Sequence, residues 1–113
     1  MADSGQHLDL EVISELKDVM GDEFPLLVDT FVNDSALRIA AINDAVSSGE
    51  PESIRRAAHS FKGSASNMGA VHLAKLCGSL EERGRSGETV GIEQLAEDIS
   101  STYRDVKEAL AKI

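Results

Sequence analysis

Aromatic residues, cysteine and proline are all scarce in this sequence. Its 113 residues include one Tyr, three Phe and no Trp, with two Pro and a single Cys. The shortage of aromatic residues, beside plentiful Ala, Leu, Ser and Glu, favours helices over β-sheet. A lone cysteine, Cys77, cannot form an intramolecular disulfide. We therefore expect an all-α protein whose core forms without disulfide bonds.

Long apolar stretches are also missing. The longest apolar stretches contain only a few residues, whereas a helix that crosses a bilayer needs roughly 20. The first ten residues are acidic and polar, and lack the basic and apolar regions of a signal peptide. These observations predict a cytoplasmic protein without a membrane span or anchor.

Basic residues are outnumbered, with 11 Lys and Arg against 20 Asp and Glu and a formal net charge of −9. Such a surface repels a phosphate backbone, so nucleic acid is not an expected partner. The charge is uneven: residues 1–50 carry −9, residues 51–85 carry +3 and residues 86–113 carry −3. A basic region on an acidic molecule is suited to attracting an acidic partner, although simple scatter of surface charges explains it equally well.

Glycine and proline divide the chain into a short leader and four longer segments, each with apolar residues at a helical period. We predict one domain over residues 1–113. Its predicted segments are a leader with a short helix at about 1–21 and bundle helices at about 22–48, 51–68, 70–84 and 90–112. Asp9 is the expected N-cap of the short helix.

Amphipathic helices joined by short connections most economically form an antiparallel up-down four-helix bundle, with the short N-terminal helix as a lid. The stretch from Gly84 to Gly87 reads as a flexible connection between the last two helices. Gly78 interrupts a predicted helix, and we interpret it as a site of close packing against a neighbour.

His59 does not fit the apolar stripe of the predicted helix at 51–68. With about 100° per residue, it lies roughly 160° from Phe61, the centre of that stripe, and should face solvent. Lys62 and Gly63 follow at the spacings of three and four residues at which side chains meet on a helix surface. An exposed imidazole is nucleophilic near neutral pH, and a lysine ammonium pairs with phosphate. A helical glycine costs roughly 1 kcal/mol relative to alanine, which clearance beside the imidazole would explain.

The run from His59 to Ala70, HSFKGSASNMGA, resembles the signature of histidine phosphotransfer (HPt) domains. That signature reads His-x-x-Lys-Gly, small residues, an apolar residue and Gly-Ala. Arg55 and Arg56 upstream also look like the family, and the helix pattern is similar from about residue 8 to residue 112. The resemblance implies a four-helix bundle whose exposed histidine takes a phosphoryl group from an aspartyl phosphate on one receiver domain and passes it to another.

The resemblance also implies roles for individual residues. His59 would carry the phosphoryl group through Nε2, Lys62 would stabilise it, and Gly63 would give the receiver clearance. The receiver supplies the aspartate and Mg²⁺, so the bundle needs no metal or cofactor of its own, and a monomer is expected. An apolar patch on the histidine helix and a basic rim should form the docking face. The expected partner-binding residues are Arg55, Arg56, Ser66 and Asn67.

These features predict a phosphocarrier, not an enzyme, that shuttles between the receiver of a hybrid sensor kinase and a response regulator. Two alternatives remain: a helical adaptor that binds receivers or kinases without carrying phosphate, and the phosphoacceptor module of a chemotaxis-type kinase.

The remaining reactive side chains carry no functional prediction. His7, in a frayed leader, and His72 lack a Lys-Gly companion at the right spacing. Cys77 reads as a small buried hydrophobe. The adjacent Glu81 and Glu82 point to different parts of a helix surface, and no His or Cys spacing fits a zinc site.

Overall fold

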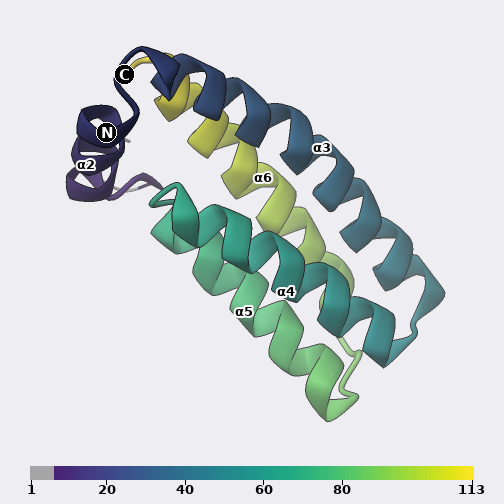
Figure 1. The fold of residues 1–113 in the computed structure, drawn as a ribbon. Helices are drawn as coiled ribbons and strands as arrows, with labels where there is room; N and C mark the ends of the chain where they lie inside the picture. The colour runs from purple at the N-terminus through teal and green to yellow at the C-terminus, as the bar shows by residue number, and fades with distance from the viewer. Residues whose placement is uncertain (1–6) are drawn as a thin grey trace.

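The computed structural model describes residues 7–113, which form helices and turns without a strand (Figure 1). The elements are α2 (Leu10–Met20), the 3₁₀ turn η1 (Gly21–Glu23), α3 (Phe24–Ser48), α4 (Pro51–Asn67), α5 (Val71–Ser86) and α6 (Ile92–Ala111). Helices α3 to α6 contact one another in chain order, and α3 also contacts α6, which closes the bundle. The predicted all-α four-helix bundle with an extra short N-terminal helix is confirmed.

Helix α2 lies at one end of the bundle, beside the connection between α4 and α5 (Figure 1). Its N-cap is Asp9, as predicted, with Oδ1 accepting from the backbone N–H groups of Glu11 at 3.0 Å and Val12 at 3.4 Å. The Asp9 N–H in turn donates to the Gly69 carbonyl at 2.7 Å. A Cβ at Gly69 would lie 3.1 Å from the Val12 Cβ. Helix α2 can therefore pack against the α4–α5 connection only because residue 69 has no side chain.

The core is formed by the apolar stripes of the helices. Side chains such as Ile54, Phe61, Leu80 and Ile99 have no exposed surface, and burying each contributes roughly 1.5–3 kcal/mol. Tyr103 of α6 lies beside Phe61, with 6.1 Å between ring centroids, and donates its hydroxyl to a backbone carbonyl of α3 at 3.3 Å. The face of α4 opposite His59 is therefore anchored deep in the bundle.

The connection predicted at Gly84 to Gly87 is wrong for all of these residues except Gly87, because α5 continues to Ser86. Gly84 is buried, and a Cβ there would lie 2.6 Å from the Arg55 nitrogen and 2.8 Å from the Pro51 carbonyl oxygen. This glycine lets the backbones of α4 and α5 touch, and the helix ends instead at Gly87, where φ is +80°.

None of the helices in the described range combines the length and the apolar character needed to cross a bilayer.

Candidate functional site

His59 lies near the middle of α4, and 64% of its side chain is exposed. The Phe61 side chain, two residues later, is completely buried. The solvent-facing position predicted for His59 is thus confirmed. The helix holds the ring rigidly at the surface because its opposite face is packed into the core.

Glu81 of α5 is the residue that sequence reasoning missed. Its side chain is only 5% exposed, and its Oε2 lies 2.9 Å from the His59 Nδ1 while its Oε1 lies 2.6 Å from the Lys62 Nζ. Arg85, one turn further along α5, places Nη2 at 3.3 Å from the same Oε2. The sequence indicated no role for Glu81, whereas in the structure this carboxylate joins α5 to the histidine of α4.

A carboxylate so deeply buried stays ionised because cations surround it. The hydrogen bond from Lys62 lowers the pKa of Glu81 against the effect of burial, which raises it, and the hydrogen bond from His59 lowers it further. The sequence carried a signal of this: Glu81 lies four residues after the buried Cys77, on the apolar stripe of its helix.

The Glu81 carboxylate fixes the tautomer of His59. An ionised carboxylate only accepts hydrogen bonds, so Nδ1 donates its proton across the 2.9 Å contact. In the neutral ring Nε2 then carries the free lone pair. The exposed imidazole presents a nucleophilic nitrogen to solvent and holds its proton on the buried side.

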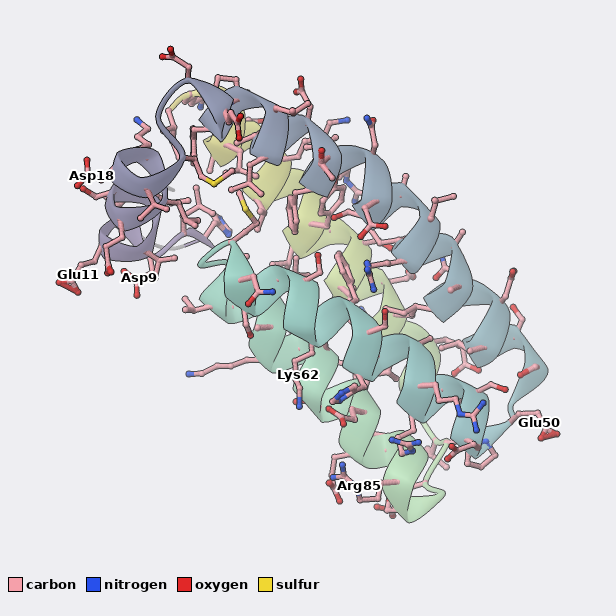
Figure 2. The ribbon with its side chains drawn as sticks, viewed as in Figure 1. Asp9, Glu11, Asp18, Glu50, Lys62 and Arg85 are labelled. Atoms are coloured by element: carbon pink, nitrogen blue, oxygen red, sulfur yellow. The ribbon has the colours of Figure 1, made fainter. Side chains whose placement is uncertain are left out.

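The Lys62 side chain runs along α5 before it reaches Glu81. A Cβ built at Gly78 would lie 3.5 Å from the Lys62 Cδ, so Gly78 faces the lysine stem across the α4–α5 interface. Figure 2 shows Lys62 and Arg85 projecting from the same side of this helix pair. The sequence predicted close packing at Gly78, but 3.5 Å is an ordinary van der Waals distance, so a methyl group would fit beside the Lys62 stem. Lys62 and Arg85 bring two cations to the carboxylate beneath His59.

Gly63 has a different environment. A Cβ built there would meet nothing within 4 Å, so no contact inside the described structure requires glycine at this position. Ser66 and Asn67, at the end of the same helix, are exposed as well. The surface from His59 to the end of α4 is therefore open and bears only small or polar side chains.

Arg55 and Arg56 lie on the N-terminal side of His59, and both bind Glu52. Arg55 contacts the carboxylate through Nε at 2.9 Å and Nη2 at 2.7 Å, and Arg56 contacts it through Nε at 2.9 Å. These hydrogen bonds, Arg55's first, lower the pKa of Glu52 to about 2. The basic rim expected from the sequence is present, but a carboxylate of the same helix already occupies it.

Helix α3 carries exposed apolar side chains, whereas the sequence predicted an apolar patch on α4. Leu26 and Leu37 of α3 are 64% and 72% exposed. A hollow of about 240 Å³ also opens between α2, α3 and α4, with Leu16, Leu27 and Met68 in its wall. The outer face of α4 is polar because its apolar residues are all used in the core. The apolar surface is therefore found on α3 and in this hollow rather than on the outer face of α4.

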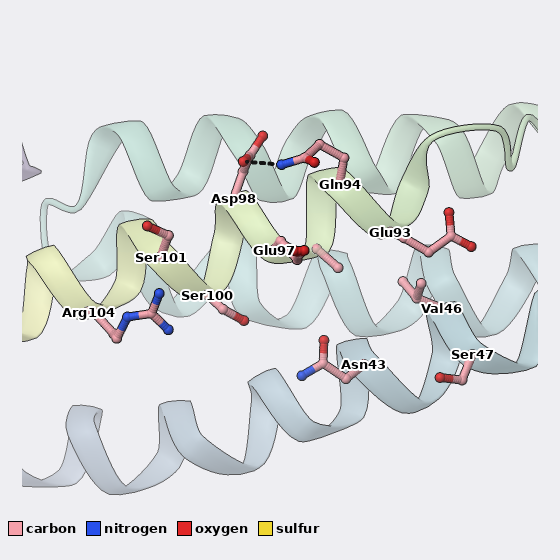
Figure 3. A pocket seen from close by; sticks show the side chains of 11 residues that line it. Asn43, Val46, Ser47, Glu93, Gln94, Glu97, Asp98, Ser100, Ser101 and Arg104 are labelled. Carbon is pink, nitrogen blue, oxygen red and sulfur yellow. Dashed lines mark hydrogen bonds between the residues drawn. The ribbon is translucent and has the colours of Figure 1, made fainter.

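Another hollow, of about 750 Å³, lies between α3 and α6 (Figure 3). Its wall consists mainly of serine, amide and carboxylate side chains, and Gln94 donates to Asp98 across 3.0 Å. No histidine, lysine or cysteine lines it, and α4 contributes nothing to it. This hollow is therefore separate from the site at His59.

The two other histidines lie away from Glu81. His72 is exposed in the first turn of α5. The sequence placed His7 in a frayed leader, but its side chain is only 14% exposed, and its Nε2 lies 3.9 Å from an Asp105 carboxylate oxygen of α6. Within residues 7–113 no group of three or more His, Cys, Asp or Glu side chains is placed to hold a metal ion.

Comparisons with known proteins identify the family of the chain. The Hpt domain family model matches residues 26–111. The crystal structure of histidine-containing phosphotransfer protein B (HptB) from Pseudomonas aeruginosa PAO1 superimposes with a TM-score of 0.91 at 42% sequence identity, over 94% of this chain and 92% of that chain. No curated protein sequence matches the chain.

Proposed function

This chain belongs to the Hpt domain family of histidine phosphotransfer proteins, and we propose that it carries a phosphoryl group on His59 between two receiver domains. The donor is an aspartyl phosphate on the receiver of a hybrid sensor kinase, and the acceptor is the aspartate of a response regulator. The protein acts in the cytoplasm as a monomeric carrier and not as an enzyme.

The contact between the His59 Nδ1 and the buried Glu81 supports this proposal most directly. The lone pair on Nε2 attacks phosphorus, a P–N bond forms, and the P–O bond to the donor aspartate breaks to release its carboxylate. The ring becomes a phosphoimidazolium that keeps its Nδ1 proton, and the charge of Glu81 compensates it at 2.9 Å. No proton has to leave, so the reverse step follows the same path.

Lys62 and Gly63 have complementary parts in this transfer. The Lys62 ammonium is partly exposed and held at Glu81, from which it reaches a phosphoryl group on the neighbouring ring by rotation of its side chain. The empty space above Gly63 admits the backbone of the approaching receiver. Both residues favour the phosphorylated, docked state rather than the stability of the free bundle.

We assign the docking face to the surface on both sides of His59. Arg55 and Arg56 supply its basic rim, and Ser66 and Asn67 supply hydrogen-bonding groups at the other end of α4. Its apolar part comes from α3, through exposed side chains such as Leu37 and the adjoining hollow. This mixture of an apolar area and a charged rim suits a transient complex with an acidic partner.

Phosphotransfer profiling tests the proposal. Receiver domains carrying a radiolabelled aspartyl phosphate are mixed with the wild-type protein, with His59→Gln and with His72→Gln, which removes an exposed histidine outside the site. Acid-labile label should move to the wild type and to His72→Gln but not to His59→Gln.

Three results would contradict the carrier assignment. Label that persists in His59→Gln would place the phosphoryl group elsewhere. Receiver binding without any label on the wild type would instead indicate an adaptor. Labelling by an ATP-bound kinase domain alone, with no receiver present, would indicate the acceptor module of a chemotaxis-type kinase.

A further inference from the structure

Glu52 lies on the proposed docking face, although nothing in the phosphotransfer step uses it. It precedes His59 by seven residues, which places the two side chains within roughly 20° of each other around α4. Its side chain is 58% exposed. Glu52 is therefore close to any partner that reaches His59.

Both arginines of the basic rim are bound to this one carboxylate. Arg56, with 75% of its side chain exposed, gives its Nε to Oε2 at 2.9 Å, and Arg55 binds both oxygens. The three side chains together carry one positive charge instead of the two that the arginines alone would present. A carboxylate on a partner must displace Glu52 before it gains a full pair with either guanidinium.

We propose that Glu52 competes with the acidic residues of the receiver for binding to Arg55 and Arg56. This competition limits how tightly and for how long the receiver stays bound. This inference rests on the proposed function, since a carrier must release its donor before it engages its acceptor. The competition weakens the complex through the arginines that attract the partner, and leaves the transfer chemistry at His59 unchanged.

The exposure of the Glu52 pairs makes this exchange feasible. Ion pairs in contact with water contribute little to stability, so an arriving carboxylate replaces Glu52 at small cost. The low pKa of Glu52 keeps it ionised throughout the neutral range, and the competition is therefore constant under physiological conditions. Glu81 is different because its own carboxylate is only 5% exposed and is therefore shielded from a partner's side chain.

The test compares Glu52→Gln with Glu93→Gln, which removes the same charge from an exposed position on α6 beside the separate α3–α6 hollow. The partner is the receiver that labels the wild type fastest in the profiling. Glu52→Gln should lower the Kd for this receiver about two- to fivefold, mostly through slower dissociation. Glu93→Gln should change the Kd by less, and both variants should melt within a few degrees of the wild type.

A double-mutant cycle separates competition from simple repulsion. In an Arg55→Gln, Arg56→Gln background, the gain from Glu52→Gln should fall to that of Glu93→Gln. A gain that persists in full there, an unchanged Kd, or weaker binding by Glu52→Gln would each overturn the proposal, the last because Glu52 would then be holding the arginines in place for the partner. A wild-type protein that no receiver labels would refute the proposed function instead.

Discussion

Alanine substitutions at the helical glycines should have opposite effects on stability. Alanine is favoured over glycine in a helix interior by about 0.5–1 kcal/mol. At Gly63 the new methyl group meets nothing within 4 Å, so Gly63→Ala should gain this full amount and raise the Tm by about 2–6 °C. Gly78→Ala, where the nearest atom is the flexible Lys62 Cδ at 3.5 Å, should gain a similar amount and is the matched control on α5.

Gly84→Ala should instead lower the stability of the protein. Its methyl group would lie 2.6 Å from the Arg55 nitrogen and 2.9 Å from the Arg55 Cα, and backbone atoms cannot move aside as a side chain does. Helices α4 and α5 would have to separate, at a cost of about 1–3 kcal/mol for overpacking. After the gain in helix propensity of at most about 1 kcal/mol, we expect a net loss of stability and a lower Tm.

Thermal and urea unfolding, followed by circular dichroism at neutral pH, measure these three differences in one experiment. The rate of phosphotransfer from a labelled receiver is measured on the same variants. Gly63→Leu should fold at least as stably as the wild type yet obstruct the receiver, whereas Gly78→Ala should transfer at nearly the wild-type rate. The reasoning fails if Gly84→Ala is as stable as the wild type, or if Gly63→Leu binds the receiver with unchanged affinity.

Three further predictions concern the site and the core. Lys62→Ala should slow phosphotransfer at least tenfold while the Tm changes by only a few degrees, because His59 and Arg85 still contact Glu81; a large loss of Tm with a normal transfer rate would contradict this. The pKa of Glu81 is lower in the folded than in the unfolded state, so its contribution to stability is complete above its ordinary pKa of 4.5 and disappears as the pH falls through the folded value. Urea midpoints between pH 3 and pH 7 should therefore fall less on acidification for Glu81→Gln than for the wild type, and parallel curves would refute the assignment. Burial raises the pKa of Cys77 to about 12, so a thiol reagent at pH 8 should modify it only after unfolding; rapid labelling of the native protein would show that the thiol is accessible.

The helices and the exposure of His59 were predictable because both depend on periodicity within a single segment. Leu73, Cys77 and Leu80 repeat at helical spacing and are all buried. The same spacing placed His59 opposite Phe61, and in the structure His59 is exposed while Phe61 is fully buried. Such patterns need no knowledge of which helix lies next to which.

Features that depend on a second helix were not predictable in the same way. Glycine is typical of a helix end, but Gly84 lies inside α5. Its presence there is explained only by the backbone of Arg55, which lies against it in α4. Glu81 stands on an apolar stripe, but its role depends on side chains 19 and 22 positions earlier in the sequence, Lys62 and His59. The pairing of Glu52 with Arg55 and Arg56 was available from the sequence, because helical spacings of three and four join them.

Glu52 and Glu81, in the basic region of residues 51–85, have different roles because they differ in burial: Glu81 acts in the chemistry and Glu52 in docking. Glu81 is shielded from solvent and held by side chains of two helices, so it cannot form an ion pair with a partner protein. It instead holds the proton of His59 on Nδ1. Glu52 lies in water with two arginines of its own helix, so a partner can displace it without disturbing the ring. Substitutions at Glu52 should therefore change receiver affinity and dissociation, while substitutions at Glu81 should change the rate of transfer within the complex. Single-turnover kinetics at saturating receiver separate the two, and a change in the saturated rate for Glu52→Gln would show that docking and chemistry are not independent.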